Sequence, residues 1–279
     1  MERLIYPCIW CDNNADEMAN FYISTFPNTE IVDQNNWAVV LKMKGQRVML
    51  LNGGDTFKPN PSFSLMYLSS SEHEIESIYN KISGDGKDLM PLDSYPFSSK
   101  YAWVEDRYGV SWQLITAAQD DIVQNVVPTL MFIGDNNGKA EEAIDYYTSL
   151  FANSRKRGVS KYTGSEGETE GNIQHAEFII NNYLLMIMDS SYPHEFEFSE
   201  GMSLVVECAN QEEVDYYWDN LTSGGGQESM CGWLKDKYGV NWQITPSIMK
   251  ELLQKSPKVM EVMMTMKKLE IAPLMEAAK

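Results

Sequence analysis

Residues 103–114 read W-V-E-D-R-Y-G-V-S-W-Q-L, and residues 233–244 read W-L-K-D-K-Y-G-V-N-W-Q-I. The two stretches are identical at seven of twelve positions, so two tryptophans, an aspartate, a tyrosine-glycine pair and a glutamine recur in register after 130 residues. Composition alone does not produce such a match. The chain is therefore predicted to contain an internal duplication, and each copy is predicted to end in this hairpin.

The duplication extends upstream of the hairpin. Three further pairs of segments match: 15–26 with 140–151, 39–52 with 176–189, and 64–79 with 203–218. The first pair predicts amphipathic helices, each after a D-N-N segment suited to capping a helix start. The second pair predicts hairpins that turn at K-G and N-N, and the third a strand that runs into a helix. Each half is therefore predicted to hold two β-α-β-β-β modules.

The repeat also sets the predicted domain boundaries. Residues 1–118 form the first domain, 119–127 a linker, 128–246 the second domain, and 247–279 a helical tail that has no counterpart in the first half. Each domain is long enough to bury its own core, and the short linker predicts that the two domains pack as neighbours.

The charge balance limits the choice of partners. With 22 basic and 40 acidic side chains the net charge is -18, which repels nucleic-acid phosphates and anionic membrane surfaces. This charge fits attraction of a cationic small molecule, but it fits a well-solvated acidic surface as well. No apolar run is long enough for a membrane span, and the start M-E-R-L-I-Y-P-C lacks signal-peptide features, so a cytoplasmic protein with reduced cysteines is expected.

Paired modules that end in W-x-x-D-[RK]-Y-G-V-x-W-Q-[LI] resemble the vicinal oxygen chelate superfamily. The nearer resemblance is to its PhnB-like branch, often labelled 3-demethylubiquinone-9 3-methyltransferase-like, and it covers about 1–118 and 126–246. The resemblance implies an α+β fold of two tandem domains, each with a curled antiparallel or mixed sheet that forms a cup around a ligand or metal. It also implies that the chain mimics the dimer of single-domain relatives, as a monomeric pseudo-dimer or a homodimer.

The resemblance further implies where a metal would bind. Metal-using members such as glyoxalase I place His or Gln near the start of a module's first strand and Glu on its last strand. The Glu positions fall on Gln113 and Gln243, and one module earlier on Met49 and Met186. The opening positions fall on Pro7, Pro128, Ser62 or Phe63, and Met202 or Ser203. Because such side chains are poor ligands for divalent cations, we expect no metal and no other cofactor.

Strand alternation separates the two faces of the closing hairpin. Gln113 shares a face with Ser111, and Trp112 lies on the other face, under the helix that bears Phe21 and Tyr22. A four-residue turn would place Trp103 opposite Trp112, with both tryptophans in the core. The candidate ligand-binding residues that line the cups are Gln113, Gln243, Met49, Met186, Ser111 and Asn241.

The glutamine amides allow two interpretations. An amide can donate and accept hydrogen bonds to a polar ligand, although it cannot act as a general base, and it can equally be a structural group that satisfies backbone atoms. The three histidines, His73, His175 and His194, occupy non-equivalent positions and are expected at the surface or in loops. No catalytic residue is identified.

Three functions remain open from the sequence. The first is metal-independent binding of a small molecule, cationic or aromatic, in the cups. The second is an enzyme of lyase, dioxygenase or transferase type whose catalytic residues are not the superfamily's usual metal ligands. The third is a drug-sequestering protein that resembles bleomycin-resistance proteins. The methyltransferase label of the branch gains no support, since no glycine-rich nucleotide-binding turn occurs.

Overall fold

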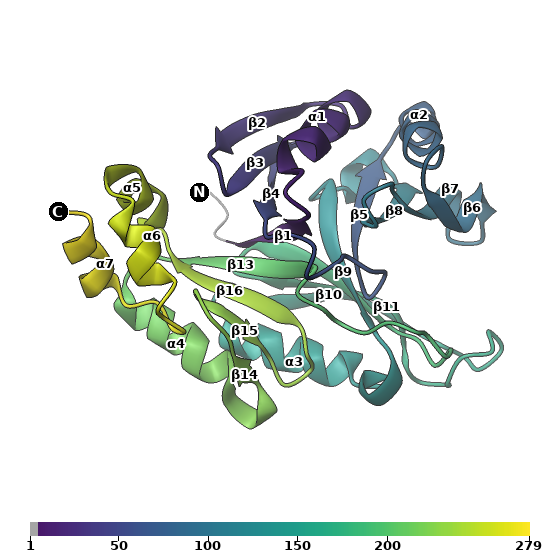
Figure 1. The fold of residues 1–279 in the computed structure, drawn as a ribbon. Helices are drawn as coiled ribbons and strands as arrows, with labels where there is room; N and C mark the ends of the chain where they lie inside the picture. The colour runs from purple at the N-terminus through teal and green to yellow at the C-terminus, as the bar shows by residue number, and fades with distance from the viewer. Residues whose placement is uncertain (1–4) are drawn as a thin grey trace. The chain divides into compact units, whose positions relative to one another are not determined.

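Four β-α-β-β-β modules follow one another along the chain, and a helical tail follows the fourth (Figure 1). The first module comprises β1 (Ile5–Cys11), α1 (Ala15–Thr25), β2 (Thr29–Gln34), β3 (Ala38–Met43) and β4 (Gln46–Asn52). The second comprises β5 (Phe63–Ser69), α2 (Glu72–Ile82), β6 (Lys87–Tyr95), β7 (Ser98–Glu105) and β8 (Ser111–Thr116). This computed structural model describes residues 5–279, so the four residues that open the sequence, on which part of the targeting expectation rests, lie outside it.

The second half repeats this order. The third module comprises β9 (Val126–Phe132), α3 (Ala140–Leu150), β10 (Arg155–Lys161), β11 (Ile173–Ile180) and β12 (Tyr183–Asp189). The fourth comprises β13 (Met202–Cys208), α4 (Gln211–Leu221), β14 (Gln227–Glu228), β15 (Trp233–Lys235) and β16 (Asn241–Pro246). The predicted tail holds α5 (Met249–Lys255), α6 (Lys258–Met263) and α7 (Ile271–Ala277), and single 3-10 turns lie at Gln119–Asp121, Gly134–Asn136 and Ser223–Gly225.

The chain divides into two compact units. One unit is Pro7–Met202, and the other is Ser203–Lys279 together with the described start of the chain up to Tyr6. The second unit therefore holds the fourth module and the tail. Its strands follow the order β14-β15-β16-β13, with β13 parallel to β16. The first module, in the larger unit, has the order β1-β4-β3-β2, with β1 parallel to β4.

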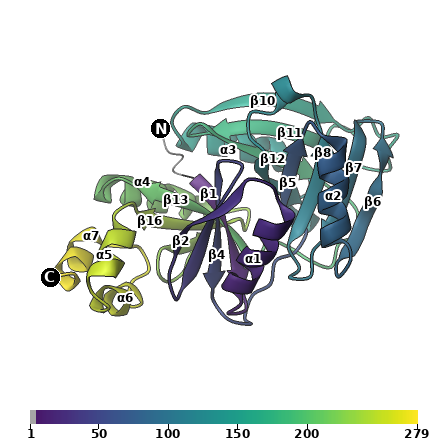
Figure 2. The same cartoon turned by 90° about the horizontal axis from the view of Figure 1, so that it is seen from above.

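An eight-stranded mixed sheet joins the second and third modules inside the larger unit. Its order is β10-β11-β12-β9-β5-β8-β7-β6, with β5 antiparallel to β9. The short connector makes this pairing possible: Leu68 N donates to Asn125 O at 2.8 Å, and Asn125 Nδ2 donates to Leu68 O at 2.9 Å. Helix α2 packs against β7 and β8 (Figure 2). The predicted α+β class of paired modules with mixed sheets is confirmed, and this sheet takes one module from each sequence half.

The two predicted hairpin turns are confirmed. Met43 pairs with Gln46 across Lys44 and Gly45, whose φ angles are 45° and 87°. In the other copy the turn residues Asn181 and Asn182 have φ angles of 47° and 63°. Two consecutive positive φ angles are typical of the type I′ turn, which favours Gly and Asn and matches the twist of the flanking strands.

Helix capping differs from the sequence prediction. The D-N-N segments do not cap α1 and α3, since neither N-cap residue makes a side-chain cap hydrogen bond. Instead, the residue that ends the last strand of the same module accepts the N–H of the first helical residue. Asn52 Oδ1 accepts from Ala15 N at 3.0 Å, and Asp189 Oδ1 accepts from Ala140 N at 3.2 Å. Tertiary contacts from β4 and β12 thus replace the local cap.

The closing hairpin is organised by one buried carboxylate. Asp106 Oδ1 accepts from Tyr108 N at 2.9 Å and Val110 N at 3.1 Å, and Oδ2 accepts from Tyr22 OH at 2.7 Å and Trp112 Nε1 at 3.0 Å. Burial raises the pKa of Asp106, and these four donors oppose that rise. In the other copy, Asp236 accepts in the same way from two backbone N–H groups and from the second tryptophan of its motif.

This carboxylate holds a five-residue loop, which sets the register. Glu105 pairs with Ser111 on either side of the loop, so Trp103 pairs with Gln113. The expectation that Trp103 lies opposite Trp112 is therefore wrong by one residue, because the loop has one residue more than assumed. A shift of one residue exchanges the faces of the sheet.

The other tryptophan lies where it was predicted. The Trp112 ring meets Tyr22 edge-on, with centroids 5.4 Å apart, and lies 4.4 Å from the Phe26 centroid. Both aromatic partners come from α1 and its C-terminal cap.

Among residues 5–279, no helix is long and apolar enough to span a membrane.

Candidate functional site

Both copies of the motif glutamine hydrogen-bond to a serine hydroxyl. Gln113 Nε2 donates to Ser64 Oγ at 2.8 Å, and Gln243 Nε2 donates to Ser203 Oγ at 2.9 Å. Tyr101 OH donates to Gln113 Oε1 at 2.7 Å, and the Gln113 side chain is 1% exposed. The serine fixes the orientation of each amide, because the nitrogen end must face the hydroxyl oxygen.

Four positions around Gln113 share one face of the eight-stranded sheet. Ser64 pairs with Thr129, and Thr129 pairs with Met186 on the next strand. Gln113 lies on β8 beside β5, and its amide reaches Ser64. We call Ser64, Gln113, Thr129 and Met186 the amide face; all four are buried.

Two of the opening-strand positions need correction. Pro128 precedes Thr129 on β9 and so lies on the opposite side of the sheet, which leaves Thr129 on the amide face. On β5 it is Ser64, and not Ser62 or Phe63, that contacts the amide.

The remaining predicted site residues lie on the strands that were expected to carry them. Met49 is half-buried on β4, beside Cys8 of β1. Ser111 is buried and accepts from Trp103 Nε1 at 2.6 Å. Asn241 is buried and donates to a backbone carbonyl of its own turn. Ser111 is thus already engaged by a protein partner.

The side chains of the amide face do not suit a divalent cation. They offer two hydroxyls, one thioether and one amide whose nitrogen and oxygen are both bonded within the protein. Zinc prefers thiolate and imidazole ligands, and magnesium and calcium prefer carboxylate oxygens. In the described part of the chain, no group of three or more His, Cys, Asp or Glu side chains lies close enough to hold a metal ion.

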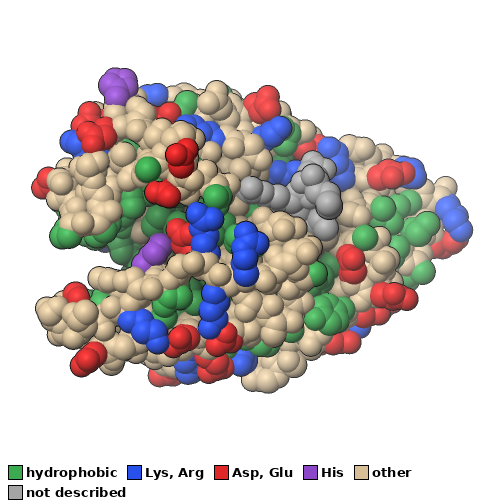
Figure 3. Space-filling model, turned by 180° about the vertical axis from the view of Figure 1, so that it is seen from behind, with side chains coloured by type: hydrophobic (Ala, Val, Ile, Leu, Met, Phe, Trp, Pro, Cys, Tyr) green, Lys and Arg blue, Asp and Glu red, His purple; other side chains and the backbone are tan. Residues whose placement is uncertain are grey.

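Glu177 and His175 are half-exposed and border the buried amide face. Glu177 pairs with Met186, so Glu177 and, two residues before it, His175 lie on the amide face side. Arg157 Nε donates to Glu177 Oε2 at 2.7 Å. Figure 3, in which the end of the molecule that carries β6 and β7 lies at the left, shows a cleft there with hydrophobic walls and a histidine inside.

His175 differs from the sequence expectation. It lies within β11 and is half-buried, although a surface or loop position was expected. Burial lowers the pKa of His175 below its usual value, and the nearby Glu177 carboxylate partly opposes this shift. The imidazole is therefore biased toward its neutral form, which can both donate and accept a hydrogen bond.

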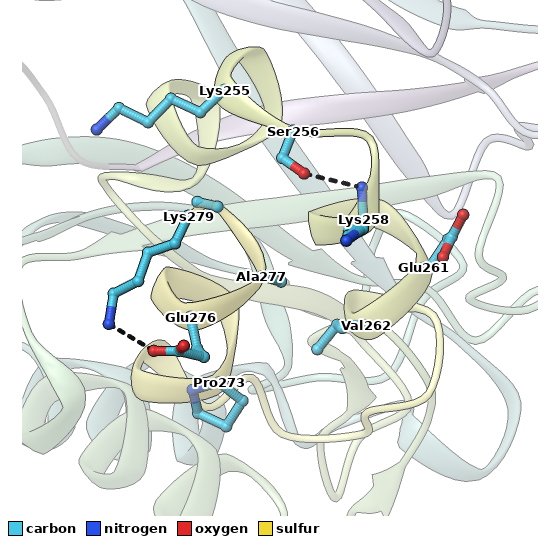
Figure 4. A pocket seen from close by; sticks show the side chains of 10 residues that line it. Lys255, Ser256, Lys258, Glu261, Val262, Pro273, Glu276, Ala277 and Lys279 are labelled. Carbon is cyan, nitrogen blue, oxygen red and sulfur yellow. Dashed lines mark hydrogen bonds and ion pairs between the residues drawn. The ribbon is translucent and has the colours of Figure 1, made fainter.

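Two open cavities lie away from the amides. One, of about 610 Å³, lies among the tail helices and is lined by charged side chains such as Lys255, Glu261 and Lys279 (Figure 4). The Lys279 ammonium there pairs with Glu276 at 2.5 Å. The other, of about 410 Å³, lies between α1 and α2 and is lined by residues that include Ser24 and His73. Neither cavity contains a residue of the duplicated motif.

Comparison with known proteins identifies the family. The family model described as 3-demethylubiquinone-9 3-methyltransferase matches residues 3–115 and 124–245. The chain belongs to this family. A search of the curated proteins found no match. A PhnB protein from Bacillus cereus, described as a 3-demethylubiquinone-9 3-methyltransferase, is 34% identical over 40% of this chain and 98% of its own, with a TM-score of 0.38.

Two solved structures align with most of the chain. Glyoxalase I from Zea mays is 13% identical over 90% of this chain and 94% of its own, with a TM-score of 0.59. A protein from Bacillus subtilis described as a dioxygenase is 10% identical over 88% of this chain and 85% of its own, with a TM-score of 0.52. At these identities the two structures share the fold alone. The family match confirms the predicted 3-demethylubiquinone-9 3-methyltransferase-like branch, and the two structures confirm the fold that the resemblance to the vicinal oxygen chelate superfamily implies.

Sequence reasoning missed several residues around the amide of this family member. Tyr101 and Ser64 contact Gln113 directly, and His175 lies on the same side of the sheet. Ser203, one of the two residues named for its opening-strand position, contacts Gln243. Tyr101 stands two residues before Trp103, so the correct hairpin register would have placed it beside Gln113. His175 carries no signal in the repeat, because residue 38, its counterpart in the first half, is an alanine.

Proposed function

We propose that this protein binds a small organic molecule at its duplicated glutamine amide and does so without a divalent metal. The observation that supports this most directly is the glutamine-serine hydrogen bond that both copies share, at 2.8 and 2.9 Å. Each glutamine lies at the position where the resemblance to metal-using members of the superfamily implies a glutamate. A neutral amide with a fixed orientation suits recognition by hydrogen bonding better than it suits cation ligation.

The charge of the chain favours one class of ligand. A net charge of -18 attracts cations over about a Debye length. Half-buried tryptophans stand opposite both amides, Trp103 at Gln113 and Trp233 at Gln243. An aromatic ring beside a hydrogen-bonding amide suits a ligand that is itself aromatic or cationic.

Ligand binding is tested by titration. Cationic drugs and small phenolic compounds would first be screened by thermal shift, since a ligand at 100 times its dissociation constant stabilises by about 2.7 kcal/mol. A hit would then be titrated against the Gln113→Ala/Gln243→Ala double variant and against Gln254→Ala, an exposed glutamine on α5. We expect the double variant to weaken binding and Gln254→Ala to leave it intact. Equal affinity in the two would refute binding at the amides.

The metal-independent part has its own test. Elemental analysis of the purified protein is expected to find zinc, nickel, iron and manganese well below one equivalent per chain. Binding of a hit should also survive treatment with a chelator. A stoichiometric metal that resists dialysis, or loss of ligand binding on chelation, would refute this part while leaving the amide hypothesis standing.

An enzyme is the second candidate, and His175 favours it. A half-buried imidazole on the amide face side, with its pKa lowered by burial, has the properties of a general acid or base. Turnover of small dicarbonyl or phenolic compounds would support this candidate if it were lost in His175→Asn and kept in His73→Asn. His73 is exposed on α2 and provides the matched control.

A further inference from the structure

The two glutamine amides differ in what meets their oxygen atoms. Gln113 Oε1 accepts from Tyr101 OH at 2.7 Å, and the side chain is 1% exposed. Gln243 is half-buried, and its Nε2 donates to Ser203 Oγ at 2.9 Å. Among the residues that the structure describes, none donates a hydrogen bond to Gln243 Oε1. In the first copy the amide oxygen therefore already has a protein donor, and in the second copy the amide oxygen is available to accept a hydrogen bond.

The sequence explains this difference. The offset of 130 residues that aligns the two motifs places Cys231 where the first copy has Tyr101. No phenol therefore occupies this position in the second copy. The strand is also shorter there, because β15 spans only Trp233–Lys235 whereas β7 spans Ser98–Glu105.

In the second copy, the residues just before the motif form backbone hydrogen bonds with the C-terminal tail. Cys231 has a φ of 60° and donates from its backbone N to Met266 O at 2.7 Å, and Gly232 N donates to Lys267 O at 2.8 Å. The Cys231 Sγ lies 3.5 Å from Met264 Sδ. The cysteine side chain thus contacts the tail. The tail has no counterpart in the first half, and the equivalent residues Tyr101 and Ala102 pair instead with Ile115 and Leu114 in the sheet.

The surroundings of Gln243 indicate the chemistry of a ligand. Trp233 is directly opposite Gln243 on β15 and is half-buried. Val205 pairs with Gln243, and Glu207, two residues further along β13, lies on the same face. The Glu207 carboxylate is half-buried and accepts from Tyr6 OH at 2.8 Å. An indole ring, an amide oxygen and a carboxylate thus occupy one face of the smaller compact unit.

We propose that the second copy is the ligand-binding copy, in which Gln243 Oε1 accepts a hydrogen bond from an aromatic molecule that carries an ammonium or hydroxyl group. The first copy is a structural one, closed by the Tyr101 hydroxyl. This inference rests on the proposed function and assigns it to one of the two amides. The donor belongs to the ligand because the amide nitrogen is already held by Ser203. The indole of Trp233 offers the ring a stacking surface, and Glu207 favours a positive charge.

The side-chain amide signals of the two glutamines provide the test. They are observed by ¹⁵N NMR in the full chain and assigned by their disappearance in Gln113→Ala and in Gln243→Ala. Benzylammonium and phenol are then added separately as probes. We expect the Gln243 amide signals to shift in a saturable way with at least one probe, and the Gln113 signals to stay in place.

A substitution at the acceptor provides the second measurement. Gln243→Met keeps a side chain of similar length and removes the acceptor, so the dissociation constant for the responding probe should rise about tenfold, the usual effect of one lost hydrogen bond. Gln227→Ala, on the exposed strand β14 of the same unit, should leave it unchanged.

The outcomes distinguish this inference from the proposed function. A response of the Gln113 signals alone, or of both amides equally, would overturn the asymmetry and leave amide-mediated binding in place. Shifts elsewhere in the spectrum with both amides silent, or no shift with either probe, would overturn both. A Gln243 response that survives Gln243→Met with unchanged affinity would show that the acceptor is not used, and would also overturn the inference.

Discussion

Trp103 lies directly opposite Gln113 in the β7–β8 ladder, and its indole Nε1 donates to Ser111 Oγ at 2.6 Å. The first tryptophan of the motif is therefore a neighbour of the amide, whereas Trp112 packs against α1. Trp233 and Gln243 repeat the same pairing in the second copy. The motif thus combines a core tryptophan, a turn-organising aspartate and a tryptophan-glutamine pair on the other face.

Removal of the Tyr101 hydroxyl should destabilise the protein. In Tyr101→Phe the buried Gln113 Oε1 loses its donor, and an unsatisfied buried acceptor costs about 1–2 kcal/mol. The measurement is the free energy of unfolding in urea. Tyr95→Phe on the same hairpin is the control, since its hydroxyl donates to Pro91 O at an exposed site and its loss should cost less than about 0.5 kcal/mol. Equal losses in the two variants would contradict a structural role for the Tyr101–Gln113 bond.

Asp106→Asn should be more damaging. All four groups that meet the carboxylate are donors, and they divide equally between its two oxygens. An asparagine must direct its NH₂ group at two of them, so we expect a loss of about 2–3 kcal/mol in the free energy of unfolding. Asp120→Asn, exposed in the linker, should change it by less than about 0.5 kcal/mol. If the two substitutions cost the same, the carboxylate does not organise the hairpin.

The cap residues of α1 and α3 are expected to differ in importance. Asp189 is buried and accepts from the backbone N of Gly138, Ala140 and Ile173, so Asp189→Ala should cost about 3 kcal/mol. Asn52 accepts from one helix N–H, and Asn52→Ala should cost about 1 kcal/mol. Denaturant titration measures both.

A residue of the D-N-N segment provides the matched comparison for these caps. Asp135 belongs to the D-N-N segment that the sequence suggests as a cap of α3, yet it is exposed, and among the described residues none donates to its carboxylate. Asp135→Ala should therefore leave the free energy of unfolding within about 0.5 kcal/mol of the wild-type value. A loss similar to that of Asp189→Ala would restore the cap assignment made from the sequence.

The sequence predicts the fold well because the duplication supplies two independent copies of each pattern. The turns at Lys44-Gly45 and Asn181-Asn182 follow from local backbone preferences, which residue types reveal directly. The packing of Trp112 under α1 follows from strand alternation once the strand is recognised. Both depend on short-range information.

The site was harder to predict because it depends on register and on contacts between distant segments. One extra loop residue moved Trp103 from the core face to the amide face, and nothing in the residue types fixes the loop length. The asymmetry between Gln113 and Gln243 depends on a tail that contacts Cys231 and Gly232 through backbone bonds, which leave no sequence pattern. The caps by Asn52 and Asp189 are tertiary contacts for the same reason.

The stability of the protein should depend on pH through His175. In the folded chain, burial lowers the pKa of His175 below 6.5, the ordinary value that also applies to the unfolded chain. In the pH interval just below 6.5, the unfolded chain therefore binds a proton more readily than the folded chain does. Stability therefore rises as pH increases through this interval and levels off above the unfolded pKa, because both states are then neutral. Acidification below the folded pKa imposes the full cost of charging the buried imidazole.

Replacement of the imidazole should reduce this dependence. In His175→Gln the gain in the free energy of unfolding between about pH 5 and pH 7.5 should be smaller than in the wild type, because one group that takes up a proton on unfolding is gone. His73→Gln, at an exposed position on α2, should keep the wild-type slope. Urea titrations at several pH values measure these slopes. An unchanged slope in His175→Gln would mean that the strand histidine is solvated well enough to titrate as in the unfolded chain, and it would remove the argument for a biased, neutral imidazole beside the amide face.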